Sequence, residues 1–215
     1  SLSEWNAKYT EAGSFSGFYE NNLVFSGPVS VLPNNDGTVW VLAYGSNELV
    51  KLNINGSVVS RVTGPLNGFD RPMDLIRLDD GNLLVTESAG NRLCVLDKKG
   101  KFLKYIGKKG RAVGNLVGPQ FAAEDSRRNI YVSDYGNRRI SVFDKDGNGL
   151  FCFGNAQNDF PGLKGPTGIA ALNENIYVAD NISGGIYEFD SSGNFRQILV
   201  PAKTFQHPES MRVWG

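Results

Sequence analysis

Apolar and polar residues alternate along this chain in short stretches, with the two-residue period of β-strands. Four of these stretches resemble one another closely and cover residues 38–43, 82–87, 129–134 and 175–180. Long stretches with a helical period are missing, and the 26 glycines suit many strands joined by tight turns. The pattern therefore predicts an all-β protein.

The alternating stretches belong to a longer repeat. A proline opens another apolar stretch before each of them, at Pro28, Pro72, Pro119 and Pro166, so the prolines are 44, 47 and 47 residues apart. A fifth copy begins at Pro208, which lies 42 residues further on. A fixed period of this length is typical of repeat proteins and β-propellers.

Each period contains four predicted strands. The third and fourth are joined by turns such as Asp-Lys-Asp-Gly, in which glycine supplies the positive φ of a hairpin. These turn glycines, Gly56, Gly100, Gly147 and Gly193, are 44, 47 and 46 residues apart. Units of four antiparallel strands at this period predict propeller blades, at approximately 25–62, 69–107, 116–154 and 163–200.

Two of the copies resemble a known repeat. The stretches "GPTGIAAL", "NIYVADN" and "NIYVSDYGNRRISVFDKDGN" are similar to the NHL repeat, a β-propeller family named for an Asn-His-Leu signature. The resemblance covers roughly residues 25 to 213 and is strongest from 69 to 195. This chain departs from the signature at its histidine, near which Arg92 and Arg138 stand instead.

The two ends predict partial blades. Residues 5–20 align with a third and fourth strand, while 207–214 supply only a first strand. Two architectures agree with this pattern. One is a five-bladed ring closed by pairing of the termini, and the other is an arc cut from a larger, six-bladed propeller. The abrupt stop after one strand favours a fragment of a longer, multidomain polypeptide.

Charge and hydropathy narrow the classes of function. The 22 basic and 22 acidic residues cancel, which argues against a nucleic-acid binder with a strongly basic face. No apolar run approaches the roughly 18 residues that would cross a membrane. The first ten residues do not form a signal peptide, although one could have been removed, in which case an extracytoplasmic location is favoured. Cys94 and Cys152 lie within apolar runs and are predicted to be buried free thiols.

The sequence lacks the residues that usually carry out catalysis. His207 is the single histidine, so neither a zinc site nor a serine–histidine pair can be assembled from the sequence. Amidating lyases related to the NHL family use zinc and several histidines, which this chain lacks. Asp74, Gln120 and Glu209 are candidates for a channel-mouth ligand or metal site, but calcium needs six to eight oxygen ligands. We therefore expect no enzyme activity, no cofactor and no bound metal.

A carboxylate closes the second strand of three blades, at Glu87, Asp134 and Asp180. Recurrence at one blade position favours a structural role, in which each carboxylate accepts backbone N–H bonds from the following turn. We call the turn from the second strand to the third strand of a blade, which begins at this carboxylate, the corner of the blade. Arg92 and Arg138 are predicted to be inter-strand partners at this corner.

Loops on one propeller face are the predicted binding surface, because loops on a rigid scaffold carry function more often than strands do. This face joins fourth to first strands and second to third strands. The candidate binding residues on it are Tyr44, Arg71, Lys108, Lys109, Arg111, Tyr135, Arg139 and Asn181, with Gln157 and Lys164 beside them.

The NHL resemblance implies a non-enzymatic interaction or sensor scaffold. Its expected partner is a protein or peptide, with a glycan as an alternative, and no membrane insertion is expected. One alternative function is a channel-mouth hydrolase of the lactonase type. A further alternative is single-stranded RNA binding, known among NHL-type propellers, which the balanced charge disfavours.

Overall fold

The fold is a set of four-stranded antiparallel sheets, seen in a computed structural model that describes residues 18–19, 22–23, 25–65, 68–157 and 159–212. The first sheet contains β3 (Pro28–Pro33), β4 (Val39–Ala43), β5 (Glu48–Leu52) and β6 (Val58–Val62), and the second contains β7 (Pro72–Arg77), β8 (Leu83–Glu87), β9 (Arg92–Leu96) and β10 (Phe102–Ile106). The third sheet contains β11 (Pro119–Glu124), β12 (Ile130–Asp134), β13 (Arg139–Phe143) and β14 (Gly149–Phe153), and the fourth contains β15 (Pro166–Leu172), β16 (Asn175–Asp180), β17 (Gly185–Asp190) and β18 (Phe195–Val200). A short hairpin of β1 (Phe18–Tyr19) and β2 (Asn22–Leu23) precedes them, and the 3₁₀ helix η1 (Tyr135–Asn137) joins β12 to β13.

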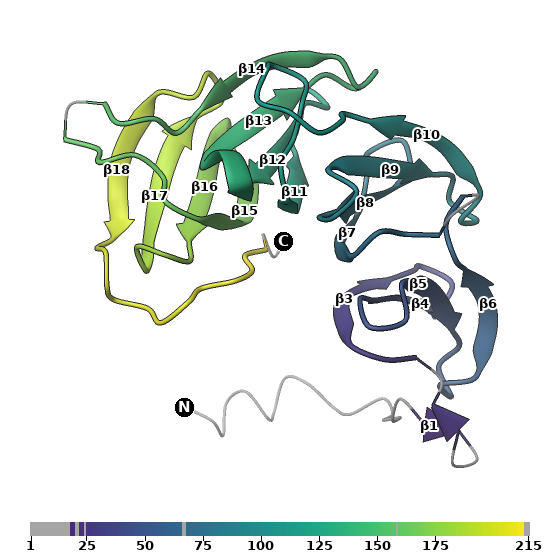
Figure 1. Cartoon of the computed structure of the whole chain (residues 1–215). Helices are drawn as coiled ribbons and strands as arrows, with labels where there is room; N and C mark the ends of the chain where they lie inside the picture. Colours follow the sequence, from purple (N-terminus) through teal and green to yellow (C-terminus); the bar gives the residue numbers. More distant parts are fainter. Residues whose placement is uncertain (1–17, 20–21, 24, 66–67, 158, 213–215) are drawn as a thin grey trace.

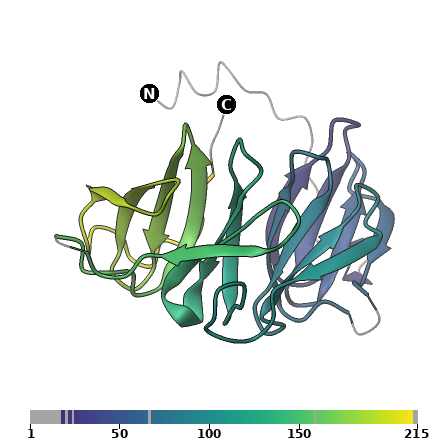
Figure 2. The same ribbon diagram turned by 90° about the horizontal axis from the view of Figure 1, so that it is seen from above.

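The predicted fold class is confirmed, because each sheet pairs its strands in chain order, as propeller blades do. Figure 1 shows the sheets fanned around a centre, with β3, β7, β11 and β15 innermost. Neighbouring sheets stand side by side when the molecule is turned (Figure 2). Among the described residues no helix is long and apolar enough to span a bilayer.

The hairpins between third and fourth strands form as the Asp-x-x-Gly pattern predicts. In the third sheet, Asp144 Oδ1 accepts hydrogen bonds from the backbone N–H groups of Asp146 and Asn148, at 2.9 and 2.8 Å. Gly147 takes φ +91°, a conformation that side-chain-bearing residues rarely adopt. The hydrogen bond from the Asn148 side chain, followed by these backbone bonds, holds the pKa of Asp144 below its usual value.

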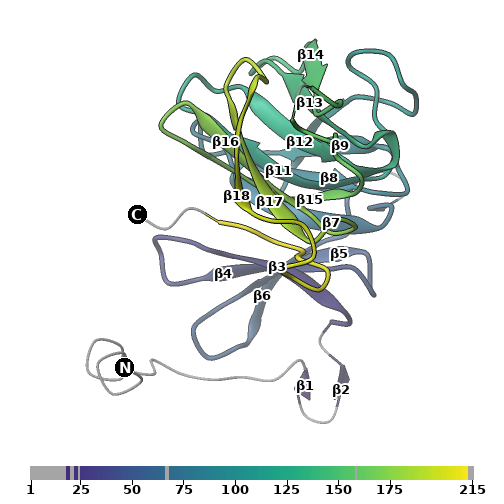
Figure 3. The same ribbon diagram turned by 90° about the vertical axis from the view of Figure 1, so that its left-hand side faces the viewer.

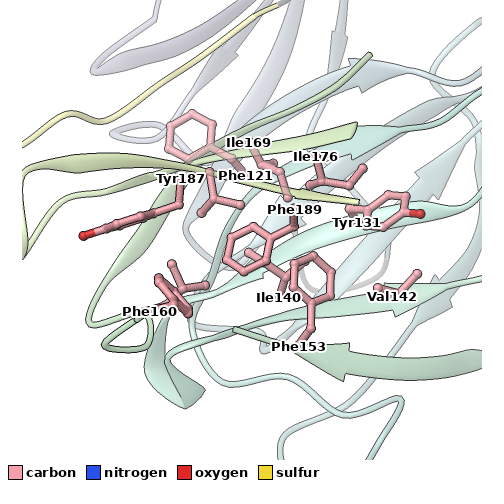
Figure 4. Packing of buried hydrophobic residues seen from close by; sticks show 12 residues of the cluster. Phe121, Tyr131, Ile140, Val142, Phe153, Phe160, Ile169, Ile176, Tyr187 and Phe189 are labelled. Atoms are coloured by element: carbon pink, nitrogen blue, oxygen red, sulfur yellow. The ribbon is translucent and has the colours of Figure 1, made fainter. Parts of the chain in front are cut away.

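Aromatic rings fill the space between the third and fourth sheets (Figure 4). Phe189 lies 5.0 Å from Phe153 and 5.2 Å from Phe160, measured between ring centroids. Phe160 belongs to the long loop between β14 and β15, yet it is only 1% exposed. This loop is therefore anchored by the core rather than only by its two ends.

The segment after β18 turns back toward the inner strands (Figures 1 and 3). Thr167 Oγ1 donates to the carbonyl oxygen of Pro208 at 2.6 Å, and Arg212 forms an ion pair with Asp74 on β7. Residues 207–212 of the predicted strand 207–214 form no strand, and the rest lie outside the described residues. Most of the predicted strands at 5–20 also lie outside them.

Candidate functional site

The predicted binding residues are spread over loops of all four sheets. They lie on the face that carries η1, which we call the η1 face, while the Asp-x-x-Gly hairpins lie on the opposite face, the hairpin face. Tyr44, Arg71 and Asn181 belong to loops around the first, second and fourth sheets and do not line the cavity described below. Arg111 and Arg139, by contrast, come together beside η1.

A cavity of about 530 Å³ opens at this point, and we call it the basic pocket. Its walls come from the β10–β11 loop, η1, the start of β13, the end of β14 and the β14–β15 loop. The residues that line it are Arg111, Gly136, Asn137, Arg138, Arg139, Cys152, Phe153 and Asn155. Among the described residues, this lining contains three arginines and no carboxylate.

Arg139 is fixed in one orientation beneath the pocket. Its Nε donates to Oδ2 of the fully buried Asp134 at 2.8 Å. Its Nη1 donates to the carbonyl of Arg111 at 2.6 Å, and Nη2 donates to the carbonyls of Ala112 and Asn115 at 3.1 and 3.0 Å. These bonds occupy four of the five N–H groups of the guanidinium, so mainly its flat face remains available.

The predicted role of Arg138 as the corner partner is wrong, because Arg139 holds that position. Arg138 takes φ +55° at the end of η1, and it is exposed. The equivalent pair in the second sheet is Glu87 with Arg92, at 2.8 Å, and both pairs are five residues apart. Arg139 therefore matches Arg92, and Arg138 matches the left-handed Asn91.

The recurring carboxylates are structural, as predicted, although two of them bind different donors from those expected. Asp180 accepts N–H bonds from Ile182 and Ser183 of the following turn. Asp134 instead accepts from the N–H of Val117, in the linker that precedes its sheet, at 2.7 Å. Glu87 likewise accepts from the linker before its own sheet, and burial raises its pKa despite the hydrogen bond from Arg92.

Exposed cations lie at the rim of the basic pocket and in the loop that forms one of its walls. Arg111 and Arg138 at its rim, and Lys108 and Lys109 in the same β10–β11 loop, are all exposed. Within the described part of the chain, none of the four side chains has an ion pair or a hydrogen bond. Such cations are available to an anionic ligand without the cost of breaking an existing contact.

The pocket exists because one fourth-strand residue is small. In the second sheet, the Tyr105 ring lies against the guanidinium of Arg92. The Cζ atom of Arg92 is 3.8 Å from the centroid of that ring. Tyr105 pairs with Cys94 in the second sheet, and Cys152 pairs with Ser141 in the third sheet. Tyr105 and Cys152 therefore occupy equivalent positions of the two sheets. In the third sheet Cys152 therefore stands where a ring would cover Arg139, and the space stays open.

The two thiols differ, contrary to the prediction that both are buried. Cys94 is fully buried, whereas Cys152 is partly exposed at the basic pocket. Burial raises the pKa of Cys94 to about 12, so roughly one molecule in ten thousand carries its thiolate at pH 8. We expect a thiol reagent such as DTNB to label Cys152 in the folded protein at least tenfold faster than Cys94, as mass mapping of labelled peptides will show.

The channel-mouth candidates do not assemble into one site. Asp74 is buried and accepts from Ser30 Oγ and the N–H of Ala122, and burial raises its pKa although Arg212 acts in the opposite direction. Gln120 bonds the carbonyl of Gly118, while Glu209 is exposed. The described residues contain no group of three or more His, Cys, Asp or Glu side chains suited to a metal ion.

Sequence comparisons identify the repeat. The chain is 35% identical over 81 residues to human NHL repeat-containing protein 3, and 30% identical over 124 residues to its mouse counterpart. It is also 30% identical over 123 residues to protein lin-41 of Caenorhabditis elegans. The repeats are NHL repeats. The human and mouse matches cover 36% and 51% of this chain but only 23% and 36% of those proteins, and no family model matches the sequence.

Solved structures support the propeller fold of this NHL-repeat chain. A streptogramin B lyase superimposes with a TM-score of 0.69 at 21% identity, covering 86% of this chain and 59% of the lyase. Virginiamycin B lyase from Staphylococcus aureus gives 0.60 at 18% identity, covering 88% of this chain and 75% of that one. At such identities the likeness concerns the fold alone.

Proposed function

We propose that this NHL-repeat propeller is a non-enzymatic interaction module that binds an acidic segment of a protein partner through the basic pocket. The observation that carries the proposal is a group of four exposed cations without partners among the described residues. Arg111 and Arg138 line the cavity, and Lys108 and Lys109 lie in the loop that carries Arg111. Complementary charge of this kind steers an acidic partner and fixes its register. The rigid sheets beneath hold the loops in place.

Support for binding rather than catalysis comes from the chemistry of the pocket. Its described lining offers guanidinium groups, amides and one thiol, but neither a histidine nor a carboxylate that could act as a general base. Arg139, which the sequence suggested as a binding residue, contributes through its position beneath the pocket rather than as a free cation.

Removing the two rim arginines tests the proposal. We expect the double variant Arg111→Gln/Arg138→Gln to bind a fluorescein-labelled oligoglutamate peptide about fivefold to tenfold more weakly than the parent chain, because each exposed pair contributes up to about 1 kcal/mol. Fluorescence anisotropy at low and high salt measures the loss, and the difference between the two proteins shrinks as salt screens the charges.

The matched control removes the same charge from the other face. Lys98 and Lys99 are exposed in the β9–β10 hairpin, at the opposite end of β10 from Lys108 and Lys109. Lys98→Gln/Lys99→Gln should leave the affinity unchanged within a factor of two. Equal losses in the two double variants, or equal binding of an oligoglutamine peptide, would contradict a site on the η1 face.

A further inference from the structure

In the second sheet, both the edge and the face of the guanidinium of Arg92 are in contact with other side chains. There the guanidinium of Arg92 is held at its edge by Glu87, through Nε at 2.9 Å and Nη2 at 2.8 Å. Its flat face is covered by the ring of Tyr105, from the neighbouring strand. This edge-held, face-stacked guanidinium shows which contacts such an arginine makes in this fold.

The edge of Arg139 is also held by hydrogen bonds, but no aromatic ring of the described residues stacks on its face. Its Nε is bound by Asp134, and its two terminal nitrogens are bound by carbonyls of the β10–β11 loop. A carboxylate could not displace these bonds without leaving Asp134 buried and unpaired, at a large cost. An aromatic ring, however, requires only the face of the guanidinium, and Arg139 lines the cavity of about 530 Å³.

We propose that the basic pocket receives an aromatic side chain of the acidic partner segment, which stacks on Arg139 as Tyr105 stacks on Arg92. The arginines at the rim then pair with carboxylates next to that ring in the partner. This inference rests on the proposed function, and it names the anchor residue that the partner must carry. Aromatic anchors in pockets dominate the energetics of many interfaces.

A protein anchor fits the surroundings better than a strand of RNA. Binding of single-stranded nucleic acid uses a row of stacking platforms along a basic groove. Here the positions equivalent to Cys152 hold Arg61, paired with Glu48, in the first sheet and Tyr105 in the second. In the fourth sheet Gly185 pairs with Asp180 at the position that Arg92 and Arg139 occupy. Among the described sheets, Arg139 is therefore the one arginine paired to the second-strand carboxylate whose face no ring covers, which suits one ring. The chain also carries no net charge.

The test compares two labelled oligoglutamate peptides that differ at one central residue, tyrosine or alanine. The parent chain should bind the tyrosine peptide about fivefold more tightly than the alanine peptide, as expected for a partly desolvated cation–π contact. Cys152→Tyr rebuilds the arrangement of the second sheet and fills the pocket. In this variant we expect equal affinities for the two peptides.

Two further variants keep the experiment decisive. Cys152→Ser leaves the pocket open, so the preference for tyrosine should remain fivefold. Cys152→Leu fills the space with an aliphatic side chain and replaces Cys152→Tyr if that variant fails to fold. Thermal unfolding of each variant shows whether it is folded before binding is measured.

The outcomes separate the inference from the proposed function. If both peptides bind equally to the parent chain, yet the Arg111→Gln/Arg138→Gln variant binds both more weakly, the acidic-partner function stands and the aromatic anchor is refuted. If neither peptide binds, the proposed function fails as well. A preference for tyrosine that persists in Cys152→Tyr also overturns the inference, as does tighter binding of an oligouridine RNA than of either peptide.

Discussion

Replacement of Asp134 by alanine should lower the free energy of unfolding by about 3 to 5 kcal/mol, because it leaves a mostly buried guanidinium without its counter-ion. The Asp134 side chain is fully buried, and only 15% of the Arg139 side chain is exposed. Besides Arg139, the carboxylate binds the N–H of Val117, the side-chain amide of Asn137 and the hydroxyl of Ser141. Urea denaturation followed by tryptophan fluorescence measures the change.

Two companion variants define the cause of this loss. Asp146→Ala removes a surface carboxylate whose one partner among the described residues is the neighbouring Lys145, so stability should not change measurably. Asp134→Ala combined with Arg139→Gln should cost clearly less than the sum of the two single changes, because both remove one shared interaction. Fully additive losses would show that the pair is not the source of the stability.

A second substitution of Asp134 also tests the link between this carboxylate and binding. Without Asp134, the edge of Arg139 loses its strongest contact and its face is no longer held toward the pocket. We therefore expect Asp134→Asn, which keeps the size of the side chain, to reduce the preference for the tyrosine peptide more than it reduces binding of the alanine peptide. A purely structural corner would affect the two peptides equally.

The strands and their period could be predicted from the sequence because alternation and turn chemistry are local. The corner could not be assigned correctly from matching letters. Gly-Asn-Arg occurs in both copies, which suggested that Arg138 matches Arg92. Counting from the carboxylate gives Arg139 instead, and the strand register agrees, since both Glu87 and Asp134 pair with the arginine five residues later. Geometry, not letter identity, decides which arginine is buried.

The basic pocket was not predicted from the sequence because it depends on the absence of a large side chain at one position of a fourth strand. A usable pattern was present, however. Counting five residues from the turn glycines Gly100 and Gly147 leads to Tyr105 and Cys152, which are followed by the buried Ile106 and Phe153. An exchange of a large ring for a small thiol at equivalent positions predicts a cavity, provided that the arginine beneath is known. That arginine required the structure.

The largest further effect is expected from Phe160→Ala, which should cost about 3 to 5 kcal/mol of stability. Phe160 lies in the β14–β15 loop, and its ring contacts Tyr187, Phe189 and Phe195 at centroid distances of 5.1, 5.2 and 4.8 Å. Removing it leaves a cavity between the third and fourth sheets. Because Asn155 at the start of this loop lines the basic pocket, binding of the tyrosine peptide should weaken as well.

The control for this loss is Phe205→Ala, since Phe205 lies in the segment after β18 and is 44% exposed. Its removal should change stability by no more than about 0.5 kcal/mol, as is usual for surface substitutions. Hydrogen exchange in Phe160→Ala should accelerate at the N–H groups of Gln157 and Leu163, which bond within the loop. If exchange there stays slow while stability falls, the loop is held by its ends, and Phe160 contributes only to the core. If exchange accelerates and stability falls together, Phe160 both fills the core between the two sheets and holds the β14–β15 loop, which forms one wall of the pocket.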